Sequence, residues 1–115
     1  MRFILSSAVI TAPGTYRYRH INIEQARVWI TGGPYHSTIR YVETARALGA
    51  LVGRPIQTRD EQVKMEPGDS ALVFRLVFPP GTRGLPIDRK GKVSTRFILD
   101  NCEIGILERV SDFPN

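Results

Sequence analysis

The sequence predicts an α/β (α+β) fold, in which a central mixed β-sheet of about five strands packs against two main helices and one short helix in a single domain, residues 1–115. Two stretches predict it most directly. Residues 71–78 (ALVFRLVF) are apolar on both faces of a strand, which is typical of a central position in a sheet. Residues 35–53 repeat apolar side chains at three- and four-residue spacing, which is typical of a helix with one buried face.

Two strands are predicted near the start of the chain. Residues 2–9 (RFILSSAV) begin with a continuous apolar run, and Ser6 and Ser7 follow toward the carboxyl end. Open sheets bind ligands at that end, so these hydroxyls are candidate ligand contacts; small residues that let a helix pack closely are the alternative. Residues 15–20 (TYRYRH) alternate aromatic and basic side chains, which predicts an edge strand. Such interleaving also suits stacking on bases, although surface strands show it too.

The first helix is predicted over residues 23–31. Asn22 and Gln25 have the spacing of a capping box, in which two side chains satisfy the free backbone groups of a helix start. A glycine pair and Pro34 end the helix. We expect its buried side to comprise Ile23, Ala26, Val28, Trp29 and Ile30.

The second helix is predicted over residues 35–53, with Ser37 as its N-cap and Gly53 as its C-terminal glycine. Its expected core-facing stripe comprises Tyr41, Ala45, Leu48 and Val52. A helix start attracts anions because its first N–H groups are unpaired and the dipole is positive there. The candidate anion-binding side chains of this first turn are His36, Ser37, Thr38, Arg40 and Tyr41. An ordinary amphipathic helix with an exposed first turn is the alternative.

The remaining elements are predicted from weaker patterns. Residues 55–65 predict a polar strand, residues 95–101 a short helix capped by Ser94, and residues 102–110 a last strand; residues 111–115 should fray. Arg75 lies in the apolar strand 71–78 and therefore needs a carboxylate partner or a ligand. Residues 79–93 form a basic, glycine-rich loop suited to phosphate, with Arg83, Arg89 and Lys90 as its candidate contacts.

The composition is that of a soluble protein with a net charge of +5 and a pI near 9.9. This charge suits a phosphate-bearing partner, and plain solubility explains it equally well. Cys102 is the single cysteine, which we expect to be a buried small hydrophobe, and two distant histidines complete no zinc pattern. No segment has the length of a membrane span or the pattern of a signal peptide, so the expected location is cytoplasmic.

Several stretches together resemble one family. They are LSSAVIT near the start, STIRYVETARALGALVG in the second helix, MEPGDSALVFRL around the strong strand and EIGILERV at the end. The chain thereby resembles the small viral and bacterial ring-nuclease family that includes viral anti-CRISPR proteins degrading cyclic tetra-adenylate. The resemblance implies a two-fold homodimer with the ring ligand across the dimer axis. It also implies metal-free chemistry without a cofactor, in which a ribose 2′-hydroxyl attacks phosphorus and a histidine protonates the leaving oxygen.

The chain departs from the family pattern at the catalytic positions. The family's Gly-His pair corresponds to Arg40 and Tyr41, so Tyr41 replaces the catalytic histidine, and a tyrosine with a pKa of about 10 is a poor proton shuttle near neutrality. The family's asparagine falls at Ser6, its arginine after the strong strand falls near Phe78, and its Asn-Arg element falls near Arg59.

Three hypotheses about function follow from the resemblance and its departures. The favoured one is a signal-quenching protein that binds a cyclic oligoadenylate without cutting it, through Ser6, Ser7, Ser37, Arg40, Arg59 and the 79–93 loop. The second is a ring nuclease whose rearranged centre uses His36 and Tyr41. The third is a structural or protein-interaction member with a vestigial pocket. A linear nucleic acid is a ligand that we do not favour.

Overall fold

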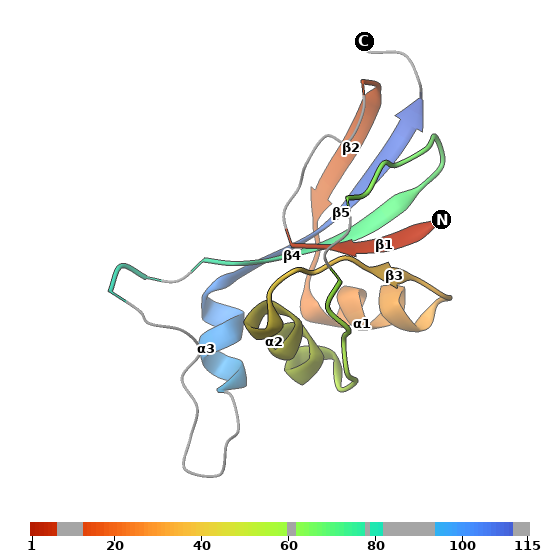
Figure 1. Ribbon diagram of the computed structural model, residues 1–115. Coiled ribbons are helices and arrows are strands. Elements are labelled where there is room, and N and C mark those ends of the chain that lie inside the picture. The colour runs from red at the N-terminus through yellow and green to blue at the C-terminus, as the bar shows by residue number, and fades with distance from the viewer. Residues whose placement is uncertain (7–12, 60–61, 78, 82–93, 112–115) are drawn as a thin grey trace.

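The computed structural model describes residues 1–6, 13–59, 62–77, 79–81 and 94–111. Within them the fold is α+β, with a five-stranded mixed sheet and three helices (Figure 1). The elements run in the order β1 Arg2–Leu5, β2 Thr15–His20, α1 Ile23–Thr31, β3 His36–Ser37, α2 Val42–Val52, β4 Ser70–Leu76, α3 Thr95–Asp100 and β5 Cys102–Ser111. No helix in these described ranges is long and apolar enough to cross a membrane.

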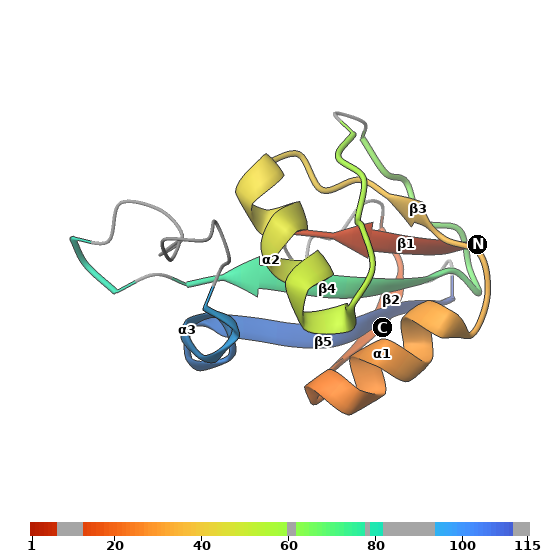
Figure 2. The same ribbon diagram turned by 90° about the horizontal axis from the view of Figure 1, so that it is seen from below.

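The sheet has the strand order β2-β5-β4-β1-β3. β1 is parallel to both of its neighbours, β3 and β4, whereas β5 is antiparallel to β4 and β2. The three helices lie on one face of the sheet (Figure 2), and α2 carries the chain from β3 across β1 to β4. The carboxyl ends of β1, β3 and β4 therefore meet at one edge, beside the start of α2.

The core is divided between the two faces of the sheet, as alternation along β4 predicts. Leu72, Phe74 and Leu76 of β4 face the helices and join the larger cluster with α1, α2 and α3. Ala71 and Val73 face the other way and join a smaller cluster that Met65 helps to cover. Because both faces of β4 are buried, its predicted central place in the sheet is confirmed.

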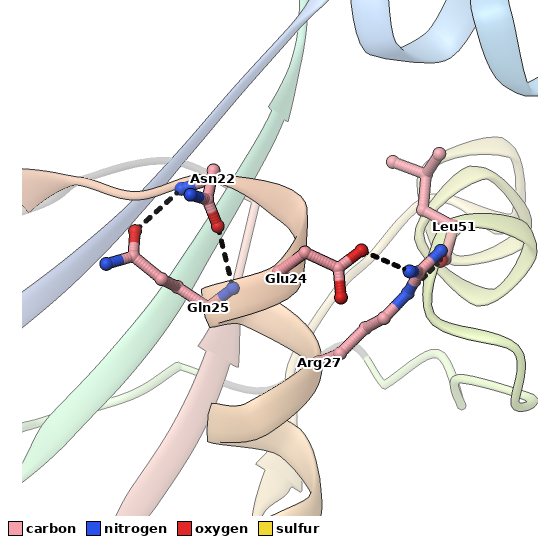
Figure 3. A network of polar contacts seen from close by, with 5 residues as sticks. All are labelled: Asn22, Glu24, Gln25, Arg27 and Leu51. Carbon is pink, nitrogen blue, oxygen red and sulfur yellow. Dashed lines mark hydrogen bonds and ion pairs between the residues drawn. The ribbon is translucent and has the colours of Figure 1, made fainter.

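A network at α1 joins this helix to the end of α2 (Figure 3). Asn22 accepts from the Gln25 N–H at 2.8 Å, and the Gln25 side chain accepts from the Asn22 N–H at 3.0 Å, which is the predicted capping box. Arg27 donates to the Leu51 carbonyl from Nε at 3.0 Å and from Nη2 at 2.9 Å, and its Nη1 lies 2.6 Å from Glu24 Oε1. The last turn of α2 is therefore held by α1, with the Arg27 guanidinium at the negative end of the α2 dipole.

The predicted start of the second helix is wrong. α2 begins at Val42 with Tyr41 as its N-cap, and Ser37 lies in the short strand β3 instead. The reason is pairing with a distant strand: His36 and Ser37 align with Phe3 and Ile4 of β1, which holds them extended. Tyr41 is consequently 65% exposed and not part of the core stripe.

Two other expectations are corrected. Residues 55–59 and 62–65 form no strand; they are held by irregular bonds, such as Ser37 Oγ to the Gln57 carbonyl at 2.6 Å and the Arg59 N–H to the Ile39 carbonyl at 2.9 Å. The fifth strand is β3, whose two residues are too few for a sequence signal. Val28 is exposed on α1 and not in its buried side.

The other element predictions are confirmed within the described residues. β2, α1 and the C-terminal glycine of α2 fall where expected, and Ser94 accepts from the Phe97 N–H at the start of α3. The predicted strands 2–9 and 71–78 end at Leu5 and Leu76 in the described part, and the final strand extends to Ser111. Predictions about residues 7–9, the 82–93 part of the basic loop and the tail 112–115 lie outside the described residues.

Candidate ligand site at the carboxyl edge of the sheet

A pocket opens at the edge where the parallel strands end and α2 begins. We call it the edge pocket. Its lining combines the residue after β1, the end of β4 and the first turn of α2: Ser6, Tyr41, Val42, Glu43, Thr44, Arg75 and Leu76. Ligands of open sheets with packed helices bind at this kind of place, beyond the carboxyl ends of the strands.

The start of α2 presents unpaired donors to this pocket. Tyr41 has the extended backbone of an N-cap, with φ −98° and ψ 131°, but its side chain makes no capping hydrogen bond. The backbone N–H groups at the beginning of a helix have no partner within the helix, and the helix dipole adds positive potential there. Glu43 lies in the same turn and partly offsets that potential.

Arg75 is a lining residue of the edge pocket, but its guanidinium is paired on the face of the sheet away from the helices. Its Nη1 lies 3.7 Å from Glu103 Oε2 on β5, so the predicted carboxylate partner is present. Glu103 also accepts from the Tyr18 hydroxyl at 3.0 Å and lies 3.6 Å from His20 Nε2. Burial and the adjacent Glu103 raise the pKa of Tyr18 to about 12. Of the two roles considered from sequence, the ion pair with a carboxylate is present, and Arg75 also lines the edge pocket.

The predicted site residues are only partly brought together. Ser6 and Tyr41 line the edge pocket, although they come from separate segments of the chain. Thr38 does not line the pocket; its N–H and its hydroxyl donate to the Ile4 carbonyl at 2.9 and 3.0 Å. Ser37 donates to the Gln57 carbonyl, which is an architectural bond. His36 aligns with Phe3 in the middle of β1, with 6.1 Å between their ring centroids, and does not line the pocket.

The predicted cationic contacts have different positions. Arg40 is exposed immediately before the N-cap of α2, next to the edge pocket in sequence but not in its lining. Arg59 is anchored through its backbone N–H to the Ile39 carbonyl. The other predicted contacts lie outside the described residues, namely Ser7, Arg83, Arg89 and Lys90.

Sequence reasoning missed Glu43 and Thr44 as pocket residues because it began the helix too early. The structural reason is that Ile39 is fully buried in the core ahead of the helix, so α2 begins only at Val42. Thr44, with 9% exposure, is the one polar residue among the five buried residues of α2, which are Thr44, Ala45, Ala47, Leu48 and Leu51. The first turn that faces the site is therefore Val42–Thr44 and not the turn after Ser37.

The described residues suggest no metal centre. They contain no group of three or more histidine, cysteine, aspartate or glutamate side chains that could hold an ion. Cys102 is half-buried and packs against the helix-side core, and burial raises the pKa of its thiol, which disfavours the reactive thiolate. The polar lining of the edge pocket comprises Ser6, Tyr41, Glu43, Thr44 and Arg75.

The fold and the site together define a small α+β protein with a polar pocket at the parallel edge of a mixed sheet. The sequence profile of the STIV B116-like family matches residues 2–82, and the chain belongs to that family. Its structure is similar to that of B116 of the Sulfolobus turreted icosahedral virus, with a TM-score of 0.73 at 20% identity, over 94% of this chain and 98% of that one. At this identity the similarity is one of fold. A search of curated proteins gives no match.

Proposed function

We propose that this protein binds a cyclic oligoadenylate-type second messenger at the edge pocket and sequesters it. The observation that supports the proposal is the uncapped start of α2, which lies where three parallel strands end and shares its pocket lining with Ser6 and Arg75. Backbone N–H groups, a hydroxyl and a guanidinium are the usual donors to phosphate oxygens. The resemblance to ring nucleases supplies the identity of the ligand, and the net charge of +5 agrees with it.

The side chains of the pocket have distinct proposed roles. The first-turn N–H groups of α2 receive one phosphate, and Arg75, which lines the pocket while its guanidinium is paired with Glu103, adds positive charge nearby. Tyr41 offers a hydroxyl and an exposed ring at the pocket wall, and Arg40 stands beside it. Hydrogen bonds hold the segment that precedes α2. The Ser37 hydroxyl donates to the Gln57 carbonyl, the Thr38 hydroxyl to the Ile4 carbonyl, and the Arg59 N–H to the Ile39 carbonyl.

Sequestration is favoured over cleavage by the position of the candidate proton donors. Cleavage of a phosphodiester by the adjacent ribose hydroxyl requires an acid at the leaving oxygen with a pKa near the working pH. Tyr41 lines the pocket but is a weak proton shuttle near neutrality, and His36 is aligned with Phe3 away from the pocket. A ring nuclease that uses these two residues is the alternative, and a protein-interaction role with a vestigial pocket is the third.

The proposal includes a homodimer, with the ring shared between two copies of the edge pocket, and a role in quenching type III CRISPR signalling in the cytoplasm. Both parts rest on the resemblance. Exposed apolar side chains near the pocket are compatible with coverage by a second copy: Tyr41 is 65% exposed, Val42 69% and Val77 48%.

The test is an incubation of the purified protein with cyclic di-, tri-, tetra- and hexa-adenylate in separate reactions. Free ligand, total ligand after denaturation of the protein, and products are quantified by chromatography. We expect depletion of free ring with full recovery after denaturation. Ser6→Val should weaken this depletion, whereas Thr31→Val, on the last turn of α1, should not.

The outcomes separate the three functions. Linear products that end in 2′,3′-cyclic phosphate would replace sequestration with the ring-nuclease alternative, and Tyr41→Phe and His36→Ala would then identify the acid. Failure to bind or cut any ring would contradict the proposal and leave the interaction role.

A further inference from the structure

A second concave surface, which we call the α2 groove, runs beside the edge pocket. It lies between α2 and the chain that returns from it, and its lining comprises Val42, Ala45, Arg46, Gly49, Gly53, Arg54, Pro55, Ile56, Gln57 and Thr58. Val42 lines both the groove and the edge pocket, so the two surfaces border the same side chain. By the rise of an α-helix, the groove extends about 16 Å from Val42 to Gly53.

The groove is built by specific local contacts. At one end Gly53 adopts a left-handed φ of 75°, which turns the chain back along the helix, and Gly53 and Arg54 both donate to the Gly49 carbonyl. A Cβ at Gly49 would lie 2.8 Å from the Arg54 carbonyl oxygen, so the close approach depends on this glycine. At the other end Ser37 holds Gln57. The shape is therefore part of the fold.

The chemistry of the groove combines an apolar floor with unpaired cations. Val42, Ala45, Gly49 and Ile56 provide small or aliphatic surface, and Val42 is 69% exposed. Arg46 and Arg54 are both exposed, and neither has an ion-pair partner among the residues that the structure describes. By contrast, Arg17, Arg27 and Arg96 each have a carboxylate partner.

We infer that the α2 groove is a second subsite of the proposed ligand site, which holds a nucleobase against its apolar floor while Arg46 and Arg54 contact the adjoining phosphate. Guanidinium planes stack on bases and bind phosphate oxygens through several donors. The faces of a base are flat and apolar and can pack against the small and aliphatic residues of the groove floor. The ligand extends from the edge pocket into the groove past Val42, which lines both. The inference rests on the proposed function and assigns a different part of the same ligand to a different surface.

Affinity for cyclic tetra-adenylate tests the inference, measured by calorimetry on the wild type and on Arg46→Glu and Arg54→Glu. Loss of a charge-assisted phosphate contact should weaken binding about tenfold or more in each variant. Arg19→Glu is the matched control: Arg19 is exposed on β2, and the substitution changes the net charge equally far from the groove. We expect this control to weaken binding by less than about threefold. Thermal unfolding verifies that each variant is folded.

A second measurement locates the base. In protein with labelled methyl groups, nuclear Overhauser contacts should join adenine protons to the methyls of Val42 and Ile56. Two results would overturn the groove assignment without affecting the edge pocket. One is wild-type binding whose affinity falls equally in the Arg46, Arg54 and Arg19 variants, and the other is adenine contacts found only with residues outside the groove. Absence of wild-type binding would instead overturn the proposed function and this inference with it.

Discussion

Arg27 illustrates how one side chain outside the candidate site determines the position of the helix that forms it. It donates twice to the carbonyl of Leu51 in the last turn of α2, and it pairs with Glu24 of its own helix (Figure 3). α2 is thereby fixed at the end opposite the edge pocket. Every helix has free C=O groups at its last turn and free N–H groups at its first turn. In α2 the free carbonyls are used to anchor the helix, and the free N–H groups remain available at the edge pocket.

The first prediction concerns this anchor. Arg27→Met should lower the free energy of unfolding by about 1 to 2 kcal/mol, because two hydrogen bonds from a charged, half-exposed donor to a carbonyl are lost. Arg96→Met is the control; its exposed ion pair with Asp100 should contribute less than about 0.5 kcal/mol. Urea unfolding measures both, and equal losses would show that the Leu51 bonds do not anchor α2.

The second prediction concerns Tyr18. Its folded pKa of about 12 lies above the ordinary value of 10.0, so the folded protein holds this proton more tightly than the unfolded chain. The corresponding stability is fully present below pH 10 and is lost as the pH rises through 12. In Tyr18→Phe the free energy of unfolding should therefore fall less between these pH values than in the wild type. Parallel curves for the two proteins would contradict the assignment.

Among the elements, the start of α2 lowers the stability of its own helix but leaves backbone donors available for a ligand. An exposed tyrosine is a poor N-cap, and it leaves the first-turn donors available. Thus a feature that weakens the helix by itself is the one that the proposed phosphate requires. Such conflicts between local preference and structure are expected at functional sites.

The third prediction exploits this conflict. Tyr41→Asp should stabilise the protein by about 0.5 to 1 kcal/mol, because a carboxylate caps the helix and complements its dipole. The same carboxylate should weaken ring binding about tenfold or more, since it occupies the donors and repels phosphate. Tyr41→Asn should cap without the charge and weaken binding less. A stabilised Tyr41→Asp variant with unchanged affinity would show that the ligand does not use the start of α2.

Local signals predicted some elements well and others poorly, for physical reasons. Three features were predictable because each depends only on residues a few positions apart: the capping box of α1, the Ser94 cap of α3 and the alternation along β2. β3 depends on pairing with β1, more than thirty residues earlier, and no local pattern reports that contact. The consequence was a helix start placed too early.

The candidate site shows the same division. Ser6 and Tyr41 were predictable as polar residues at the end of a strand and near a helix start, and both line the edge pocket. Glu43 and Thr44 were not, because the true first turn was misplaced. The α2 groove depends on the approach of Arg54 to Gly49, which only the folded chain reveals.

At the scale of the whole molecule, the net charge of +5 is consistent with a ligand that carries several phosphates. The fourth prediction follows: affinity for cyclic tetra-adenylate should fall steadily as salt is raised, because phosphate contacts compete with counterions. Titrations at three salt concentrations measure this dependence. An affinity that does not change with salt would contradict recognition through phosphate.

The most direct test of the account is an amide-resolved NMR titration of the protein with cyclic tetra-adenylate. If the ring binds in the edge pocket, saturable shifts should be largest for the surrounding amides, those of Ser6, Glu43, Thr44 and Leu76. Smaller shifts should follow along α2 toward Gly53. Largest shifts on β2, the outer strand on the side of the sheet away from β3, or no shifts at any ligand concentration, would contradict binding of the ring in the edge pocket.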